Sequence, residues 1–282
     1  MTPTKDRQRA AARAKLEREM AARAEKARKR RQLQAGIGAG VAALLVIVGA
    51  VWLVTSLGGG EETEQPGAQP SGSAGAGNCV YAPVTQPTPS PGATPDTSRK
   101  DVGTPPANEP RSGKQTMTIN FGQGPVTAEI DVSKVPCTAA SFTHLASQKF
   151  FDNTKCHRLT TEGLKVLQCG DPTGTGSGGP AYTMAEENLP VGQRPTYPRG
   201  SIAMAKSQAP GSTSSQFFIV YGDSELSPDY TLLGHITSGL DVIEKIGAVG
   251  HDGAFDPDPG GGHPKQDVII KSLTMSAVTS GS

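Results

Sequence analysis

The sequence predicts a mainly β domain over residues 113–282, in which short antiparallel strands close into a barrel with two helices over its ends. Apolar and polar residues alternate in short runs through this part of the chain, as they do in half-buried strands. Gly and Pro cluster between the runs, where turns are needed. Two stretches instead carry apolar residues at helical spacing, so two helices are expected.

Three segments precede this domain. Residues 1–35 are dense in Arg and Lys and in residues that favour helices, so we expect a charged, solvated helix there. This segment could bind anionic lipid or nucleic acid, or it could serve as a topology signal. We favour the topology signal because an apolar run follows directly. The formal net charge of +1 for the whole chain gives no reason to expect a nucleic-acid partner.

Residues 36–57 form an apolar run without a charged side chain. At about 1.5 Å per residue in a helix, such a run covers the roughly 30 Å of bilayer hydrocarbon. No convincing signal-peptide cleavage site follows it. The excess of Arg and Lys before the run places the N-terminus in the cytoplasm. The sequence therefore predicts a single-pass cell-membrane protein whose C-terminal bulk is extracytoplasmic.

Residues 58–112 are rich in Gly, Pro, Ser and Thr and poor in large apolar side chains. They cannot bury enough surface to offset the cost of ordering the chain, which predicts a disordered linker. Cys79 and Tyr81 interrupt this composition. They either pack on the domain as an outpost or stand there by chance.

The expected elements of the domain follow in order along the chain. A β-hairpin over 115–132 turns at Gly122–Pro125, and a helix begins at Pro136, whose ring suits a first helical turn. A second hairpin joins 156–160 to 164–169. The remaining expected elements are strands at 200–206, 215–222 and 231–236, a helix at 239–250, an enlarged loop at 251–265 and a closing strand at 266–275.

The second hairpin carries two polar side chains among apolar neighbours, Arg158 and, facing it across the hairpin, Gln168. A guanidinium there keeps its charge near neutral pH and offers a fixed set of donors. An isolated Arg on a strand is usually a structural cation, so a functional role for Arg158 depends on the motifs around it. Four motifs occur in order: His157-Arg158, Gln168–Asp171, the Gly-rich run Gly174–Gly179 and Ser215–Ile219.

These motifs resemble the active-site segments of the cyclophilin-type peptidyl-prolyl cis-trans isomerases. The resemblance implies a closed eight-stranded antiparallel barrel with two helices, no cofactor, and proline-containing polypeptides as substrates. It also implies that Arg158 stabilises the twisted amide while Gln168 binds the substrate backbone. Apolar residues implied for the proline pocket are Phe218, Leu226 and Val166. Residues implied for the adjoining groove are Gly176, Ala205, Lys206, Ser207, Gln216 and Tyr230.

The chain departs from the family pattern near this pocket. Leu164–Val166 stand where the family has a Phe-Met pair, in a turn about two residues longer than usual. Glu225 occupies a position where many members have Trp, which implies weak binding of cyclosporin-type inhibitors. Lys206 replaces an Asn. These departures leave a second interpretation open, that of a catalytically weak peptide-binding or chaperone module on the same fold.

The four cysteines suggest disulfides, since the domain is expected outside the cytoplasm. Four cysteines allow three pairings. Cys156 and Cys169 lie near the ends of one hairpin, and their pairing would leave Cys79 for Cys137. The five histidines lack metal-ligand spacing, so no metal site is expected.

Overall fold

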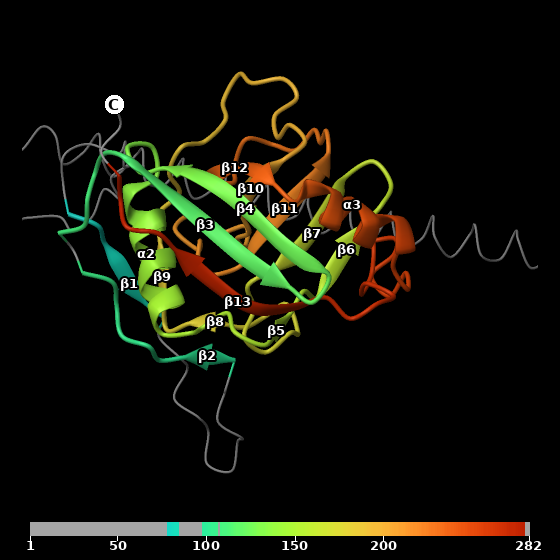
Figure 1. Ribbon diagram of the computed structural model, residues 1–282, viewed down its shortest axis with the longest axis horizontal. Coiled ribbons are helices and arrows are strands. Elements are labelled where there is room, and N and C mark those ends of the chain that lie inside the picture. The colour runs from blue at the N-terminus through green and yellow to red at the C-terminus, as the bar shows by residue number, and fades with distance from the viewer. Residues whose placement is uncertain (1–77, 85–97, 107, 280–282) are drawn as a thin grey trace, which may run out of the picture. The chain divides into compact units, whose positions relative to one another are not determined.

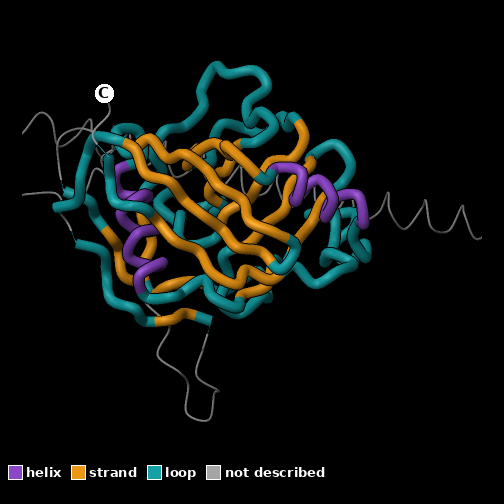
Figure 2. Tube along the Cα trace, in the orientation of Figure 1, coloured by secondary structure: helices purple, strands orange, loops and turns teal. Residues whose placement is uncertain are grey.

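The computed structural model describes residues 78–84, 98–106 and 108–279. Most of the regular structure within them is β, with two helices (Figures 1 and 2). The longer strands are β3 (Lys114–Phe121), β4 (Gly124–Asp131), β7 (Lys165–Cys169), β10 (Ser201–Met204), β11 (Phe217–Gly222), β12 (Leu232–Ser238) and β13 (Ile269–Met275). The short strands are β1 (Tyr81–Pro83), β2 (Arg99–Lys100), β5 (Thr154–Lys155), β6 (Arg158–Thr160), β8 (Gly179–Pro180) and β9 (Tyr182–Met184). The helices are α2 (Pro136–Ser147) and α3 (Leu240–Val249).

Nine of these strands form one curled antiparallel sheet in the order β5-β13-β3-β4-β12-β10-β11-β7-β6. The expectation of eight strands closed into a ring is therefore not what the strand pairing gives. Hydrogen bonds outside the strands nevertheless bring β6, the last strand of this order, next to the segment that leads into β13. The Cys156 amide donates to the Val268 carbonyl at 2.9 Å, and Leu159 and Gly262 exchange two backbone bonds of 2.8 and 3.0 Å.

The first hairpin forms as its alternating pattern predicts. β3 and β4 pair from Lys114↔Asp131 to Phe121↔Gly124, so the turn contains Gly122 and Gln123. Alternate side chains on β3 are fully buried while their neighbours stay accessible, as expected for a strand with one face on a core. This hairpin supplies the third and fourth strands of the sheet order.

The two helices lie at opposite ends of the sheet in Figure 1. α2 begins with Pro136, whose missing amide hydrogen costs nothing in a first turn. The Glu187 carboxylate accepts hydrogen bonds from the Cys137 and Thr138 amides at 3.1 and 2.8 Å and from the Thr138 hydroxyl at 2.7 Å. A carboxylate at this position satisfies two free amides and complements the positive end of the helix. α3 begins after Gly239, whose φ of 82° favours glycine.

Aromatic rings fill the space between α2 and the sheet. Phe142 of α2 packs 5.3 Å from Phe151 and 5.8 Å from Phe217 of β11, measured between ring centres, and all three rings are fully buried. Removing one such ring costs about 3–5 kcal/mol of folding free energy. The core therefore fixes β11, the strand that carries Phe218, against α2.

The folded unit reaches back into the segment expected to be linker. We call residues 78–84 and 98–106 the N-terminal arm. Its β1 pairs with β9 and its β2 with β8, and a disulfide joins Cys79 to Cys137 in α2. Strands of two or three residues are too short to show a periodicity in the sequence. Residues before 113 that contact the domain thus include Cys79 and the strands β1 and β2.

Two regions of the sequence prediction lie wholly outside the described residues, the basic segment 1–35 and the apolar run 36–57. Among the residues that the structure describes, no helix has the length and apolar character needed to cross a bilayer.

Candidate active site

Arg158 and Gln168 are directly paired across β6 and β7, as the hairpin predicts. The Arg158 side chain is half-buried, and its guanidinium donates from Nε to the Gly260 carbonyl at 3.0 Å and from Nη2 to the Pro259 carbonyl at 2.6 Å. Burial lowers the pKa of Arg158, and the neighbouring Tyr230 acts in the opposite direction. The site thus holds an oriented, charged donor.

The carbonyls that hold Arg158 belong to the enlarged loop 251–265. Within it, the Phe255 and Gly260 amides donate to the Gly261 and Phe255 carbonyls, both at 2.9 Å. The Asp256 carboxylate accepts the Gly261 amide at 2.7 Å and braces the same small turn. The loop is therefore built as a support for Arg158, a role that its Gly- and Pro-rich sequence did not reveal.

Apolar side chains implied for the proline pocket form one cluster beside β11. Its buried members include Val166, Phe218 and Ala203, and Leu226 and Tyr230 pack against them. The ring centres of Phe218 and Tyr230 lie 5.6 Å apart in an edge-to-face arrangement. The structure therefore brings together the residues that the resemblance implied, with Leu164 of the lengthened turn added to them.

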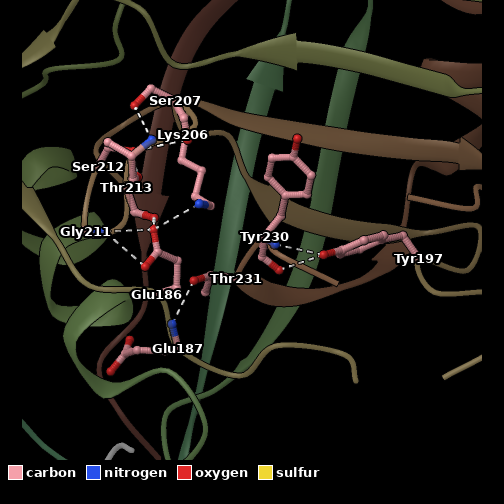
Figure 3. Close-up of polar contacts among 11 residues, drawn as sticks. Glu186, Glu187, Tyr197, Lys206, Ser207, Gly211, Ser212, Thr213, Tyr230 and Thr231 are labelled. Atoms are coloured by element: carbon pink, nitrogen blue, oxygen red, sulfur yellow. Dashed lines mark hydrogen bonds and ion pairs between the residues drawn. The ribbon is translucent and has the colours of Figure 1, made fainter. Parts of the chain in front are cut away.

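Tyr197 is a buried member of this cluster that sequence reasoning missed. Its hydroxyl donates to the Tyr230 carbonyl at 2.9 Å and accepts the Tyr230 amide at 3.0 Å (Figure 3). Burial raises the pKa of Tyr197 to about 12, so the phenol stays protonated and can make both bonds. Tyr197 lies in a long loop without periodicity, and only its size hinted at burial.

Gln168 lines a groove that encloses a cavity of about 360 Å³. Gln168 donates to the Gln216 side chain at 3.0 Å, and Gln216 donates to the Gly176 and Gly178 carbonyls at 2.9 and 3.0 Å. Residues lining the groove include all but one of those implied for it, namely Gly176, Ala205, Lys206, Ser207 and Gln216. Tyr230 is the exception, because it packs in the apolar cluster.

Lys206 is neutralised where it meets the groove. Its ammonium lies 3.5 Å from the Glu186 carboxylate, and both side chains are largely buried (Figure 3). The same carboxylate accepts the Gly211 amide at 3.1 Å. Glu186 therefore links Lys206 to the loop that follows Lys206. The sequence around Lys206 did not predict this partner.

Hydrogen bonds to Asp171 fix the conformation of the Gly-rich run. Asp171 is buried and accepts hydrogen bonds from the Thr173 amide at 2.7 Å and the Gly176 amide at 2.6 Å. Burial alone would raise the pKa of Asp171, but these bonds lower it below its usual range. A Cβ at Gly178 would lie 2.0 Å from the Asp171 carboxylate, so only glycine fits there. The run thus lines the groove as a fixed wall.

His157 is buried beside this wall, and among the described residues its Nδ1 atom has no hydrogen-bond partner. Burial lowers its pKa, Asp171 raises it, and Arg158 lowers it further. A neutral imidazole results near pH 7. The imidazole contributes packing to the site and does not act as a charged group.

Two disulfides form within the described residues. Cys156, before β6, pairs with Cys169, at the end of β7, across a Cα–Cα distance of 4.1 Å. Cys79 pairs with Cys137 across 5.3 Å. These are the two pairs that the hairpin argument suggested.

Comparison with known proteins identifies the family. Residues 116–275 match the model for "Cyclophilin type peptidyl-prolyl cis-trans isomerase/CLD". A "Probable peptidyl-prolyl cis-trans isomerase B" from Mycobacterium leprae is 40% identical over 223 residues, which cover 74% of this chain and 70% of that protein. Its namesake from Mycobacterium tuberculosis H37Rv is 39% identical over 228 residues, covering 74% and 67%.

Solved structures agree with this assignment. A cyclophilin type peptidyl-prolyl cis-trans isomerase from Cryptosporidium parvum superposes with a TM-score of 0.51 at 26% identity, covering 59% of this chain and 99% of that one. The same protein in the presence of the dipeptide Ala-Pro gives a TM-score of 0.50. With its curled antiparallel sheet, its two helices and these relatives, the chain belongs to the cyclophilin-type peptidyl-prolyl cis-trans isomerase family.

Proposed function

We propose that this chain is a membrane-tethered cyclophilin that accelerates rotation about X–Pro bonds in extracytoplasmic polypeptides and so assists their folding. One observation carries the catalytic part of this proposal. Arg158 pairs with Gln168 across β6 and β7, and two loop carbonyls fix its guanidinium. Gln168 pairs in turn with Phe218, a member of the apolar cluster.

Prolyl isomerisation requires no covalent step. Resonance holds the X–Pro bond planar with a barrier of about 18–20 kcal/mol. In the twisted transition state the prolyl nitrogen becomes pyramidal and accepts a hydrogen bond that the planar amide accepts poorly. A guanidinium has five N–H donors, and the two bonds to the loop leave others for the substrate. Arg158 therefore acts where binding is stronger in the transition state than in the ground state.

The remaining residues bind and orient the substrate. Phe218, Val166 and Leu226 offer apolar contacts to a proline ring. Gln168 and Gln216, fixed by their mutual hydrogen bond, offer amide groups to the backbone that precedes the proline. The groove beyond them takes the residues upstream of the bond that rotates.

Sequence features support the proposed location. The uncharged run 36–57 suits a membrane span, and the Arg and Lys excess before it favours a cytoplasmic N-terminus. Both disulfides are consistent with an oxidising compartment outside the cytoplasm. A membrane anchor would keep the isomerase near polypeptides as they emerge from the membrane.

A protease-coupled isomerisation assay on the purified full chain tests the catalytic claim. Catalysis of Ala-Pro rotation above the uncatalysed rate is expected. Peptide binding without catalysis would instead support the weak binding module. Protease added to cells with an opened wall tests the location, and loss of the C-terminal domain is expected. Full protection of that domain would reverse the proposed orientation.

A further inference from the structure

The N-terminal arm supplies part of the groove wall. Val84 and Arg99 line the same cavity as Gln168, Lys206 and Gln216. Neither arm residue lies within the family-matched segment 116–275. The groove is therefore completed by residues that the family pattern does not contain.

Backbone bonds hold the arm in place on both sides of this wall. The Val84 amide donates to the Ala181 carbonyl at 2.9 Å, and the Gly179 amide donates to the Ser98 carbonyl at 3.1 Å. The Cys79–Cys137 disulfide fixes the start of the arm to α2. Arg99 is consequently presented by a paired strand and not by a free tail.

The Arg99 guanidinium lies directly against the Gly-rich wall. A Cβ built on Gly179 would lie 2.7 Å from Arg99 Nη1 and 2.9 Å from the Ser214 hydroxyl oxygen. Within the described parts of the chain, no carboxylate forms an ion pair with this guanidinium. Lys206, the other cation of the groove, is already paired with Glu186. Arg99 thus provides the groove with its uncompensated positive charge.

We propose that Arg99 is a specificity-determining residue that favours substrates with Asp or Glu two or three positions before the proline. A guanidinium matches a carboxylate in shape and donor geometry, and a partly buried setting strengthens their attraction. The position follows from the groove, which receives the residues upstream of the proline. This inference rests on the proposed function.

Two peptide series test it on the purified full chain, acetyl-Xaa-Ala-Pro-Phe-nitroanilide and acetyl-Xaa-Ala-Ala-Pro-Phe-nitroanilide, with Glu, Gln or Lys at Xaa. We expect kcat/KM for the Glu peptide to exceed that for the Gln peptide by about three- to fivefold at low ionic strength in at least one series. The preference should shrink as salt screens the charges. Arg99→Gln should bring the Glu-to-Gln ratio close to one, and Arg99→Lys should keep part of it.

Lys100→Gln is the matched control. Lys100 is the neighbour of Arg99 on β2, but its ammonium lies 5.8 Å from the centre of the Phe150 ring. This variant removes the same charge and should keep the wild-type ratio. Equal loss in both variants would assign the effect to overall charge, and a ratio near one in the wild type would also overturn the proposal.

Activity toward the Gln peptides separates this inference from the proposed function. If the wild type shows no activity toward the Gln peptides, the catalytic proposal is refuted. The Glu preference would then be measured as the ratio of the binding constants for fluorescent Glu and Gln peptides. Active enzyme without a Glu preference would refute the role of Arg99 alone.

Discussion

Arg158 is oriented by main-chain carbonyls, and no carboxylate among the described residues pairs with it. A carboxylate partner would fix the guanidinium equally well, but it would also cancel most of its field at the reacting amide. Carbonyl dipoles fix the direction of the donors and leave the net charge in place. The donors of Arg158 are therefore already oriented, and they need little reorganisation when the substrate amide twists.

Arg158→Ala should reduce kcat/KM by roughly 10²–10³, because a charge-assisted hydrogen bond made in the transition state is worth about 2–4 kcal/mol. Arg158→Lys should also fail substantially, since one mobile ammonium cannot reproduce the planar fork. Activity and melting temperature are compared on the full chain. Arg199→Ala is the control, because Arg199 forms a surface ion pair with Glu244. Normal activity in a folded Arg158→Ala protein would end the catalytic assignment.

His157 should make stability depend on pH. Its pKa is lowered in the folded protein, so the unfolded chain binds a proton more readily. Its contribution is fully present above the ordinary histidine value of about 6.5 and is lost as the pH falls below it. Melting temperatures measured from pH 8 to pH 5 should therefore decline below about 6.5. His157→Gln should flatten this part of the curve, and an unchanged slope would assign it to other groups.

At the scale of elements, the loop 251–265 supports the Arg158 side chain, for which we propose the catalytic role. Asp256→Ala removes the carboxylate that accepts the Gly261 amide, and the carbonyls of Pro259 and Gly260 should lose their alignment. We expect kcat to fall by about tenfold with little change in KM, since positioning acts on the reacting geometry. Asp256→Asn keeps an acceptor oxygen and should restore most of the activity. Asp258→Ala, an exposed change in the same loop, should have little effect.

The connection between β11 and β12 should limit binding of cyclosporin-type inhibitors. Glu225 occupies a position where many family members have Trp, and its carboxylate accepts a hydrogen bond from the Thr196 hydroxyl at 3.1 Å. It offers neither a large apolar surface nor an indole donor. Inhibition titrations should give weak binding for the wild type and tighter binding for Glu225→Trp. Strong inhibition of the wild type would contradict the alignment.

Sequence patterns predicted the elements that have long periodic runs or motifs. The β3–β4 hairpin, both helices and the facing of Arg158 and Gln168 could all be predicted, because local spacing determines them. The parts that could not be predicted depend on distant partners. Tyr197 and Glu186 act through residues elsewhere in the chain, and the strands of the arm are too short to carry a period. The backbone bonds from Leu159 to Gly262 and from Cys156 to Val268 likewise involve irregular segments.

At the scale of the whole molecule, the Cys79–Cys137 disulfide closes a long stretch of chain, with a sequence separation of 58. Chain entropy alone gives such a crosslink about 4 kcal/mol of stabilisation. Replacing both cysteines by Ser should lower the melting temperature by about 8–16 °C, at about 2–4 °C per kcal/mol. Calorimetry on the full chain measures this change. Replacing Cys156 and Cys169 by Ser should lower the melting temperature less, because their disulfide spans a sequence separation of only 13.

The binding groove extends beyond the segment that matches the family, because the arm contributes residues to it. A protein cut to the family-matched residues 116–275 would retain Arg158 and the apolar cluster. It would also leave a free thiol at Cys137 and open one side of the groove, where Val84 and Arg99 had stood. Such a fragment would be a broader and more oxidation-sensitive enzyme than its parent. Selectivity measured on it would describe the family and not this protein.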